Sequence, residues 1–171
     1  MDEGTLPFDA TMDALQALIE SRFSLAASSL KVYPVTVYYG LSLADMIEAG
    51  HYDWVNGSIT AEHFPIVGEG MVDLNINLLH FKRFIQSDEA IKEMDEMGLR
   101  PLTLPELLAF GAKFPDMQRE FPIIAFGTVW QDRDGFRGVP ALGEYDRGCN
   151  LGLVWFGYRW SGTYRFAAVR K

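Results

Sequence analysis

A strictly alternating segment in the middle of the chain imposes the strongest constraint on the fold. Over Met71–Leu78, apolar and polar side chains occupy alternate positions. A period of two is typical of a β-strand with one face in the core and the other in solvent. The apolar face would carry Val72, Leu74, Ile76 and Leu78, and the polar face Asp73, Asn75 and Asn77. A helix would scatter these side chains around its axis, so the fold must include a sheet.

Helical patterns flank this strand on both sides. Apolar residues recur at helical spacing from Thr11 or Asp13 to about Ser28, which predicts a first helix. Three shorter helices follow, each with start and stop signals: Ser42 to Gly50, Ser87 or Asp88 to Met97, and Thr103 to Gly111 or Phe114. A second alternating strand, rich in β-branched residues, is predicted over Tyr33–Tyr39.

The chain becomes rich in strands from Pro122 onward. The predicted elements are a strand over Ile123–Phe126 and Val129–Trp130, a hairpin turn at Asp132–Gly135, a returning strand over Phe136–Leu142, and two strands around a Gly-rich loop within Asn150–Arg170. Helices first and antiparallel strands last predict an α+β fold. The 171 residues are expected to form a single domain, with a helical and mixed half over 1–121 and a β-rich half over 122–171.

The charge balance excludes one broad class of partner. Lys and Arg number 15 and Asp and Glu 23, which gives a net charge of −8. Sequence-independent nucleic-acid binding needs a cationic surface, so no nucleic-acid partner is expected. No apolar run approaches the roughly 20 residues of a membrane span. The start, Met1–Gly4, lacks the features of a secretory signal, which predicts a cytoplasmic protein, although a virion-borne protein would have the same features.

Catalytic and metal-binding patterns have little support. The single cysteine, Cys149, excludes an internal disulfide and has no neighbouring base in the sequence. The three histidines, His51, His63 and His80, lack the spacing of a metal motif. Four carboxylates near predicted hairpin tips, which lack the ligand spacing of a calcium loop, are better interpreted as a solvated rim: Asp132, Asp134, Glu144 and Asp146. We therefore expect no enzyme, no cofactor and no metal.

The segment Gly148–Tyr164 has an unusual composition. Its five aromatic residues are interleaved with Gly, Ser, Asn, Thr and Arg, and it contains no Lys, Glu or Asp: Trp155, Phe156, Tyr158, Trp160 and Tyr164. Antibody binding surfaces use the same residue types, because aromatics supply contact area and small polar residues adapt their hydrogen bonds. Neighbours such as Trp155 and Phe156 should point to opposite faces of a strand. The alternative interpretation is a set of ordinary core strands joined by glycine turns.

Fixed residues around this segment resemble a known protein family. The pattern joins Leu151, Leu153, Trp155 and Trp160 to the closing residues Tyr164–Phe166 and Ala168–Arg170. It is similar to the C-terminal variable region of proteins diversified by retroelements, of the kind found in small-genome archaea and candidate-phyla bacteria. In that family a reverse transcriptase miscopies the adenines of a template. AAC codons then scatter into many residues but never into Trp, Lys, Glu, Gln or Met.

The resemblance implies a set of variable, ligand-binding positions within a region of about 148–165. All of them carry residues that a randomised AAC codon permits: Asn150, Gly152, Val154, Phe156, Gly157, Tyr158, Arg159, Ser161, Gly162, Thr163 and Tyr164. Phe156 and Tyr158 would be exposed anchors, with Asn150, Ser161 and Thr163 as adaptable polar contacts. The ligand would be a macromolecule, most naturally a protein.

The resemblance also implies a fold and a framework. The stretch Gly98–Leu108 is similar to the GxRLPTxxEL helix start of the C-type-lectin-like fold, which is related to the formylglycine-generating enzyme fold. The closing Arg165–Arg170 resembles its terminal strand. Framework residues anchored in the core would be Leu151, Leu153, Phe166, Ala168 and Val169, with Trp155 and Trp160 as scaffold and Arg165 and Arg170 as braces. The chain lacks the enzymes' cysteine pair and the disulfides and calcium triplets of sugar-binding lectins.

Two alternatives to diversified binding remain. In one, a fixed virion or envelope module uses the aromatic segment as an oligomer interface. In the other, an enzyme on the same scaffold uses Cys149 or a histidine-bound metal. The sequence specifies neither the oligomeric state nor the identity of the ligand.

Overall fold

The computed structural model describes residues 12–20 and 31–171. They belong to two separate units, Met1–Leu30 and Lys31–Lys171. Residues 12–20 are helical, which confirms the middle of the first predicted helix, and its remainder lies outside the described residues. Over the ranges that the structure describes, no helix is both long and apolar enough to cross a membrane.

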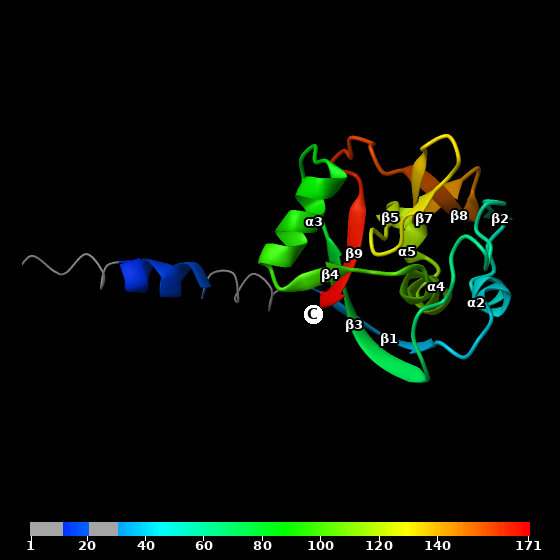
Figure 1. Cartoon of the computed structure of the whole chain (residues 1–171), viewed down its shortest axis with the longest axis horizontal. Helices are drawn as coiled ribbons and strands as arrows, with labels where there is room; N and C mark the ends of the chain where they lie inside the picture. Colours follow the sequence, from blue (N-terminus) through cyan, green and yellow to red (C-terminus); the bar gives the residue numbers. More distant parts are fainter. Residues whose placement is uncertain (1–11, 21–30) are drawn as a thin grey trace, which may run out of the picture. The chain divides into compact units, whose positions relative to one another are not determined.

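A single mixed sheet organises residues 31–171 (Figure 1). Among the described residues it contains nine strands, in the order β1-β3-β9-β5-β7-β8-β2, with β4 paired to β9 and β6 paired to β7. The strands are β1 (Val32–Tyr38), β2 (Trp54–Val55), β3 (Met71–Leu79), β4 (Leu99–Pro101), β5 (Ile123–Ile124), β6 (Trp130–Gln131), β7 (Arg137–Tyr145), β8 (Gly148–Trp155) and β9 (Arg165–Arg170). The fold is therefore α+β.

The C-terminal strand β9 lies in the interior of this sheet. It is antiparallel to β3 and β4 and parallel to β5. The expected purely antiparallel C-terminal end is therefore wrong, because β5–β9 and β2–β8 are parallel pairs. Strands β1, β3 and β4 come from the mixed N-terminal half and complete the same sheet as the strands of the β-rich C-terminal half.

Local signals place the helices. They are α2 (Leu43–Ala49), α3 (Ser87–Glu96), α4 (Leu104–Lys113) and the short α5 (Met117–Glu120). Ser42 and Asp45 form a reciprocal capping box at the start of α2, which ends at Gly50. Gly98, at φ 71°, follows the end of α3 and takes the left-handed backbone that favours glycine. The predicted bounds of α2, α3 and α4 are confirmed to within a residue or two.

Both faces of the sheet are covered. On one face, α2 and α4 pack over the apolar side of the sheet, where the core includes Val35, Val37, Ile76, Leu107, Leu108, Phe110, Leu142, Leu151, Ala167 and Val169. On the other face, Phe166 packs against Phe126 and Trp160. Successive residues of β9 thus enter opposite cores, which explains why Phe166–Val169 are all buried.

A buried carboxylate joins the end of β1 to β4 and the start of α4. Glu106 is 1 % exposed, and Arg100 donates to its two oxygens at 2.9 and 2.7 Å. The Thr103 N–H donates at 2.8 Å and the Tyr39 hydroxyl at 3.2 Å. Burial alone would raise the pKa of Glu106, but the Arg100 and Thr103 hydrogen bonds outweigh it and hold this pKa below its usual value.

Glu106→Gln should therefore destabilise the protein by about 2–3 kcal/mol at neutral pH, less than for a fully buried ion pair because Arg100 is partly exposed. Because the folded-state pKa is depressed, this stabilisation is complete above the ordinary glutamate pKa of about 4.3 and fades as the pH falls through the lower folded value. Urea unfolding of both proteins across pH 3–7 measures the difference. If the difference in the free energy of unfolding between the two proteins does not narrow toward low pH, this account is contradicted.

Candidate ligand-binding surface

Strand β8 alternates its side chains between the two faces of the sheet. Leu151 pairs with Leu142, and both are fully buried. Asn150, Gly152 and Val154 lie on the opposite face and are half-buried. Three predicted variable positions therefore share one face, while the intervening residues anchor the strand.

An exposed tryptophan that the sequence did not single out lies beside these positions. Trp54 on β2 pairs in parallel register with Asn150, so both side chains point to the same face. A Cβ placed on Gly152 would lie 3.9 Å from the Trp54 ring, an ordinary van der Waals contact. Position 152 can therefore accept a side chain. The sequence offers little to identify Trp54 as a surface residue, because it is a large aromatic in a segment with no helical or strand period.

A groove of ≈ 680 Å³ opens at the start of β8. It lies between Trp54 and Tyr145, which are 53 % and 80 % exposed, and its lining also includes Asp53, Asp146, Arg147, Gly148 and Asn150. Asp53 fixes this end of β8, because its carboxylate accepts from the Cys149 N–H at 2.7 Å and its N–H donates to the Cys149 carbonyl at 2.8 Å.

The β7–β8 turn uses an unusual backbone. Asp146 and Arg147 lie between paired Tyr145 and Gly148 and have φ values of 48° and 64°. A two-residue turn in which both residues have a left-handed backbone matches the twist of a hairpin, and its usual sequence is Asn-Gly. A residue less suited to this backbone than glycine or asparagine destabilises the turn by about 1 kcal/mol. The sequence places a hairpin tip near Glu144 and Asp146, and this turn forms it without the Asn-Gly signal.

The loop between β8 and β9 is held by Trp160. This residue is fully buried, and its backbone pairs with Ile85 through hydrogen bonds of 2.9 and 3.0 Å. Its indole N–H donates to the Ser87 hydroxyl at 2.9 Å, and that hydroxyl donates to the Phe156 carbonyl. Two points of the loop are thus attached to the first turn of α3. The expectation that Trp160 is scaffold is confirmed.

Two tyrosines form the outer layer over Trp160. The Tyr158 and Tyr164 rings lie 5.2 and 5.0 Å from the Trp160 ring, edge to face. Tyr158 remains 42 % exposed. Burial, together with a hydrogen bond to Tyr158, raises the pKa of the Tyr164 hydroxyl above its ordinary value. The exposed edge of this layer is accessible for contacts with a ligand.

The remaining loop positions are exposed or half-buried. Gly157, Arg159 and Thr163 are exposed, and Ser161, Gly162 and Tyr164 are half-buried. The Arg159 guanidinium lies 4.8 Å from the ring centre of Phe84, itself 58 % exposed. His80 Nε2 donates to the Gly162 carbonyl at 2.5 Å. Every predicted variable position except Phe156 is therefore exposed or half-buried.

The structure overturns the expected roles of two aromatic residues. Phe156 was predicted to be an exposed anchor but is only 5 % exposed, between Phe126 and the Arg137 guanidinium. Trp155 was predicted to be scaffold but is 54 % exposed. By the alternation of the strand, Phe156 continues the face of Asn150, Gly152 and Val154, and Phe126 and Arg137 cover this face at Phe156.

The framework residues hold the two ends of the surface. Leu151, Phe166, Ala168 and Val169 are buried, and Leu153 packs against the core, as expected. Arg165 donates to the carbonyls of Thr163 and Tyr164 at 3.2 and 3.3 Å, and its guanidinium lies 4.3 Å from the Phe121 ring. The bracing role predicted for Arg165 is confirmed, whereas Arg170 is exposed at the end of β9.

The other candidate residues are not brought together. His63 Nδ1 lies 2.9 Å from the Ser58 carbonyl, and its ring stacks on Trp130. Cys149 is buried, and Asp132 accepts the N–H groups of Asp134 and Phe136 within its own turn. Among residues 12–20 and 31–171, no three His, Cys, Asp or Glu side chains are grouped as metal ligands would be.

Comparison with known proteins adds no assignment to this geometry. The chain matches no protein-family model, no curated protein and no solved structure.

Substitution should separate the buried aromatic from the exposed one. Phe156→Ala is expected to cost about 3 kcal/mol because it empties a buried site, whereas Tyr158→Ala, at a partly exposed position, should cost about 1 kcal/mol or less. Urea denaturation of both variants and the parent protein measures the difference. Equal costs would contradict the burial described for Phe156.

Proposed function

We propose that this protein is a ligand-binding variable protein of the kind diversified by retroelements. In this proposal the outer face of β8 and the following loop form the diversified surface, and its ligand is another protein. The observation that carries the proposal is a separation of roles. Positions predicted to vary are exposed or half-buried, with the one exception of Phe156. Among the predicted framework residues, five are buried, Leu153 and Arg165 are half-buried, and Trp155 and Arg170 are exposed; the buried ones are Leu151, Trp160, Phe166, Ala168 and Val169.

The backbone of this surface is compatible with many residue types. Of the glycines at predicted variable positions, Gly152, Gly157 and Gly162, none has a positive φ. Side chains are therefore not barred by backbone conformation. A Cβ at Gly157 would approach the exposed Trp155 ring, which can move, and one at Gly162 would lie 3.2 Å from the Lys82 backbone, so this last position has the least room.

The surface also has the composition expected of a protein-binding site. Tyr158 and Tyr164 offer rigid aromatic area at low entropic cost, and Ser161 and Thr163 offer short polar groups. The exposed Trp54 lies outside the variable segment and would be a constant contact. No catalytic group is part of the proposal.

A C-type-lectin-like fold is part of the same proposal. The stretch that resembles this fold, Gly98–Leu108, forms β4 and the start of α4, joined by the Arg100–Glu106 ion pair. The resembling terminal segment, Arg165–Arg170, forms the interior strand β9. These positions support the likeness because both motifs meet in one β-pair, Leu99–Pro101 with Ala168–Arg170.

A fixed oligomer interface is the second candidate, favoured by the exposed aromatics Trp54, Tyr145 and Trp155. It requires invariant codons and an oligomer that Trp54→Ser or Trp155→Ser would dissociate. Light scattering after size exclusion, on the parent and both variants, measures this.

The deciding experiment is sequencing of the gene's 3′ end and its neighbourhood in the source population. The proposal expects substitutions confined to codons of about 148–165, a nearby near-copy with adenines at those codons, and a reverse transcriptase gene. Because Phe156 is buried, its codon should vary less than those of Tyr158 and Thr163. Invariant codons without a second copy would overturn the proposal.

Tolerance at the variable surface can be measured with one matched pair of substitutions. Gly152→Ser should change the free energy of unfolding by less than about 0.5 kcal/mol, because its Cβ meets only Trp54 at 3.9 Å. Gly127→Ser should cost about 2–3 kcal/mol, because its Cβ would lie 2.4 Å from the Leu102 carbonyl oxygen. Denaturation curves of the two variants test this, and a larger loss at position 152 would contradict the assigned face.

A further inference from the structure

Strand β1 forms the edge of the sheet farthest from β2 in strand order. The ladder with β3 continues at Tyr39, whose N–H donates to the Gly70 carbonyl at 2.9 Å. In an antiparallel pair, hydrogen-bonded positions alternate, so the odd-numbered residues of β1 bond to β3. The backbone groups of the even-numbered residues Val32, Pro34, Thr36 and Tyr38 therefore point away from β3, toward the edge.

This edge is closed at Pro34 and at its far end, and the stretch between these two points is open. Pro34 has no N–H, and its carbonyl accepts from Lys113 Nζ at 2.7 Å. At the far end, the Tyr38 carbonyl accepts from the Leu41 N–H at 3.2 Å. Between these two points, the outward groups with no partner among the described residues are the N–H and carbonyl of Thr36 and the N–H of Tyr38, and their spacing allows a further strand to bond to them.

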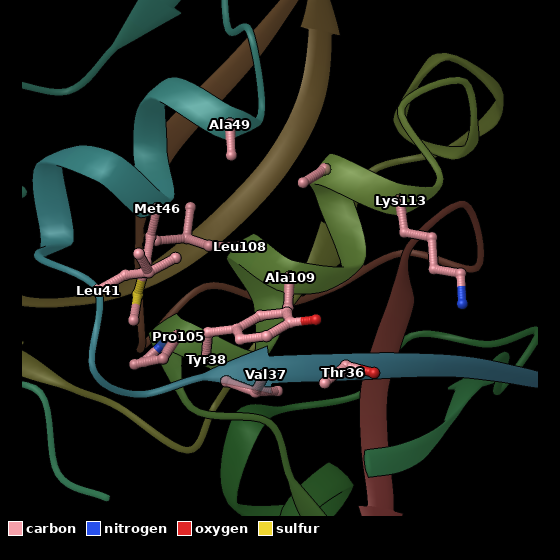
Figure 2. A pocket seen from close by; sticks show the side chains of 11 residues that line it. Thr36, Val37, Tyr38, Leu41, Met46, Ala49, Pro105, Leu108, Ala109 and Lys113 are labelled. Atoms are coloured by element: carbon pink, nitrogen blue, oxygen red, sulfur yellow. The ribbon is translucent and has the colours of Figure 1, made fainter. Parts of the chain in front are cut away.

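An apolar groove of ≈ 510 Å³ runs beside this open stretch (Figure 2). It lies between β1, α2 and α4, and Figure 2 shows the Tyr38 ring extending beneath Ala109. Its apolar lining is mainly Leu41, Met46, Ala49, Pro105, Leu108 and Ala109. Lys113 is the one charged residue of the lining.

We propose that this edge and groove bind an extended peptide of a partner protein, which adds to the sheet as a further strand along Thr36–Tyr38. Such strand addition takes affinity from main-chain hydrogen bonds and specificity from a side-chain pocket. One apolar side chain of the peptide would enter the groove, and a carboxylate would lie near Lys113. The site does not depend on the proposed variation of β8.

A second copy of this chain fits the edge less well. It would present the same closed groups, the Pro34 position and the Tyr38 carbonyl, so a symmetric β1–β1 pairing would form few ladder bonds. A separate peptide supplies a donor and an acceptor at every second residue and can carry the acidic group that Lys113 favours.

The test uses a phage library of random dodecapeptides, selected on the full chain and counter-selected on Ala109→Trp, which fills the groove. Enriched peptides should combine apolar residues with an acidic one. A synthetic enriched peptide is then titrated by fluorescence anisotropy against Thr36→Pro and Thr36→Val. Both variants lose the Thr36–Asp73 side-chain hydrogen bond, but only proline removes the outward N–H.

The Kd of the peptide for Thr36→Val should be within about twofold of the parent value. For Thr36→Pro the Kd should rise at least about tenfold, which corresponds to roughly 1.4 kcal/mol of binding free energy. Hydrogen exchange of the Thr36 and Tyr38 amides should slow when the peptide is added. Circular dichroism checks that each variant is folded, and Ala109→Trp tests the groove independently if Thr36→Pro is not. The proposal fails if no peptide is enriched on the parent protein relative to Ala109→Trp. It also fails if enriched peptides do not slow hydrogen exchange of the Thr36 and Tyr38 amides. A dimer seen by light scattering that Ala109→Trp dissociates would instead identify a second copy as the occupant and overturn the proposal.

Discussion

The double burial of β9 is the constraint on which the rest of this structure depends. Its odd residues enter the core beneath α4, and its even residues enter the core that contains Phe126 and Trp160. Because β9 pairs with β3, β4 and β5, the last segment of the chain joins strands from both halves. The loop before it consequently has both ends fixed, one by β8 and the other by β9. A loop held in this way can change its outward side chains without changing its path.

Buried polar contacts give this framework its specific geometry. The Ser87 hydroxyl connects the Trp160 indole to the Phe156 carbonyl, and Glu106 collects donors from Arg100, Thr103 and Tyr39. Each group would be costly to bury alone, so only the arrangement that satisfies all of them is stable. This explains how a surface rich in glycine and small polar residues can rest on a rigid base. The two ends of the sheet therefore offer different groups for contacts. The surface around β8 offers mainly side chains, and the edge of β1 offers backbone N–H and carbonyl groups.

Local signals in the sequence were sufficient for most individual elements. Ser42 with Asp45, and Thr103 with Glu106, marked helix starts, because a cap acts within one turn. Alternation over Tyr33–Tyr39 and Met71–Leu78 marked β1 and β3, because a sheet face has a period of two. The elements that were missed, β2, β4 and α5, are too short to show a period.

The sequence by itself thus determined the longer helices and strands, whose caps and periods are local. Only the tertiary structure decided which aromatic residue is covered. Trp155 and Phe156 are adjacent large aromatic residues, yet only Phe156 is covered, by Phe126 and Arg137. Likewise, Trp54 lies beside Asn150 through a parallel pairing between residues almost a hundred positions apart. Burial depends on which distant element packs over a face, and no local pattern records that choice.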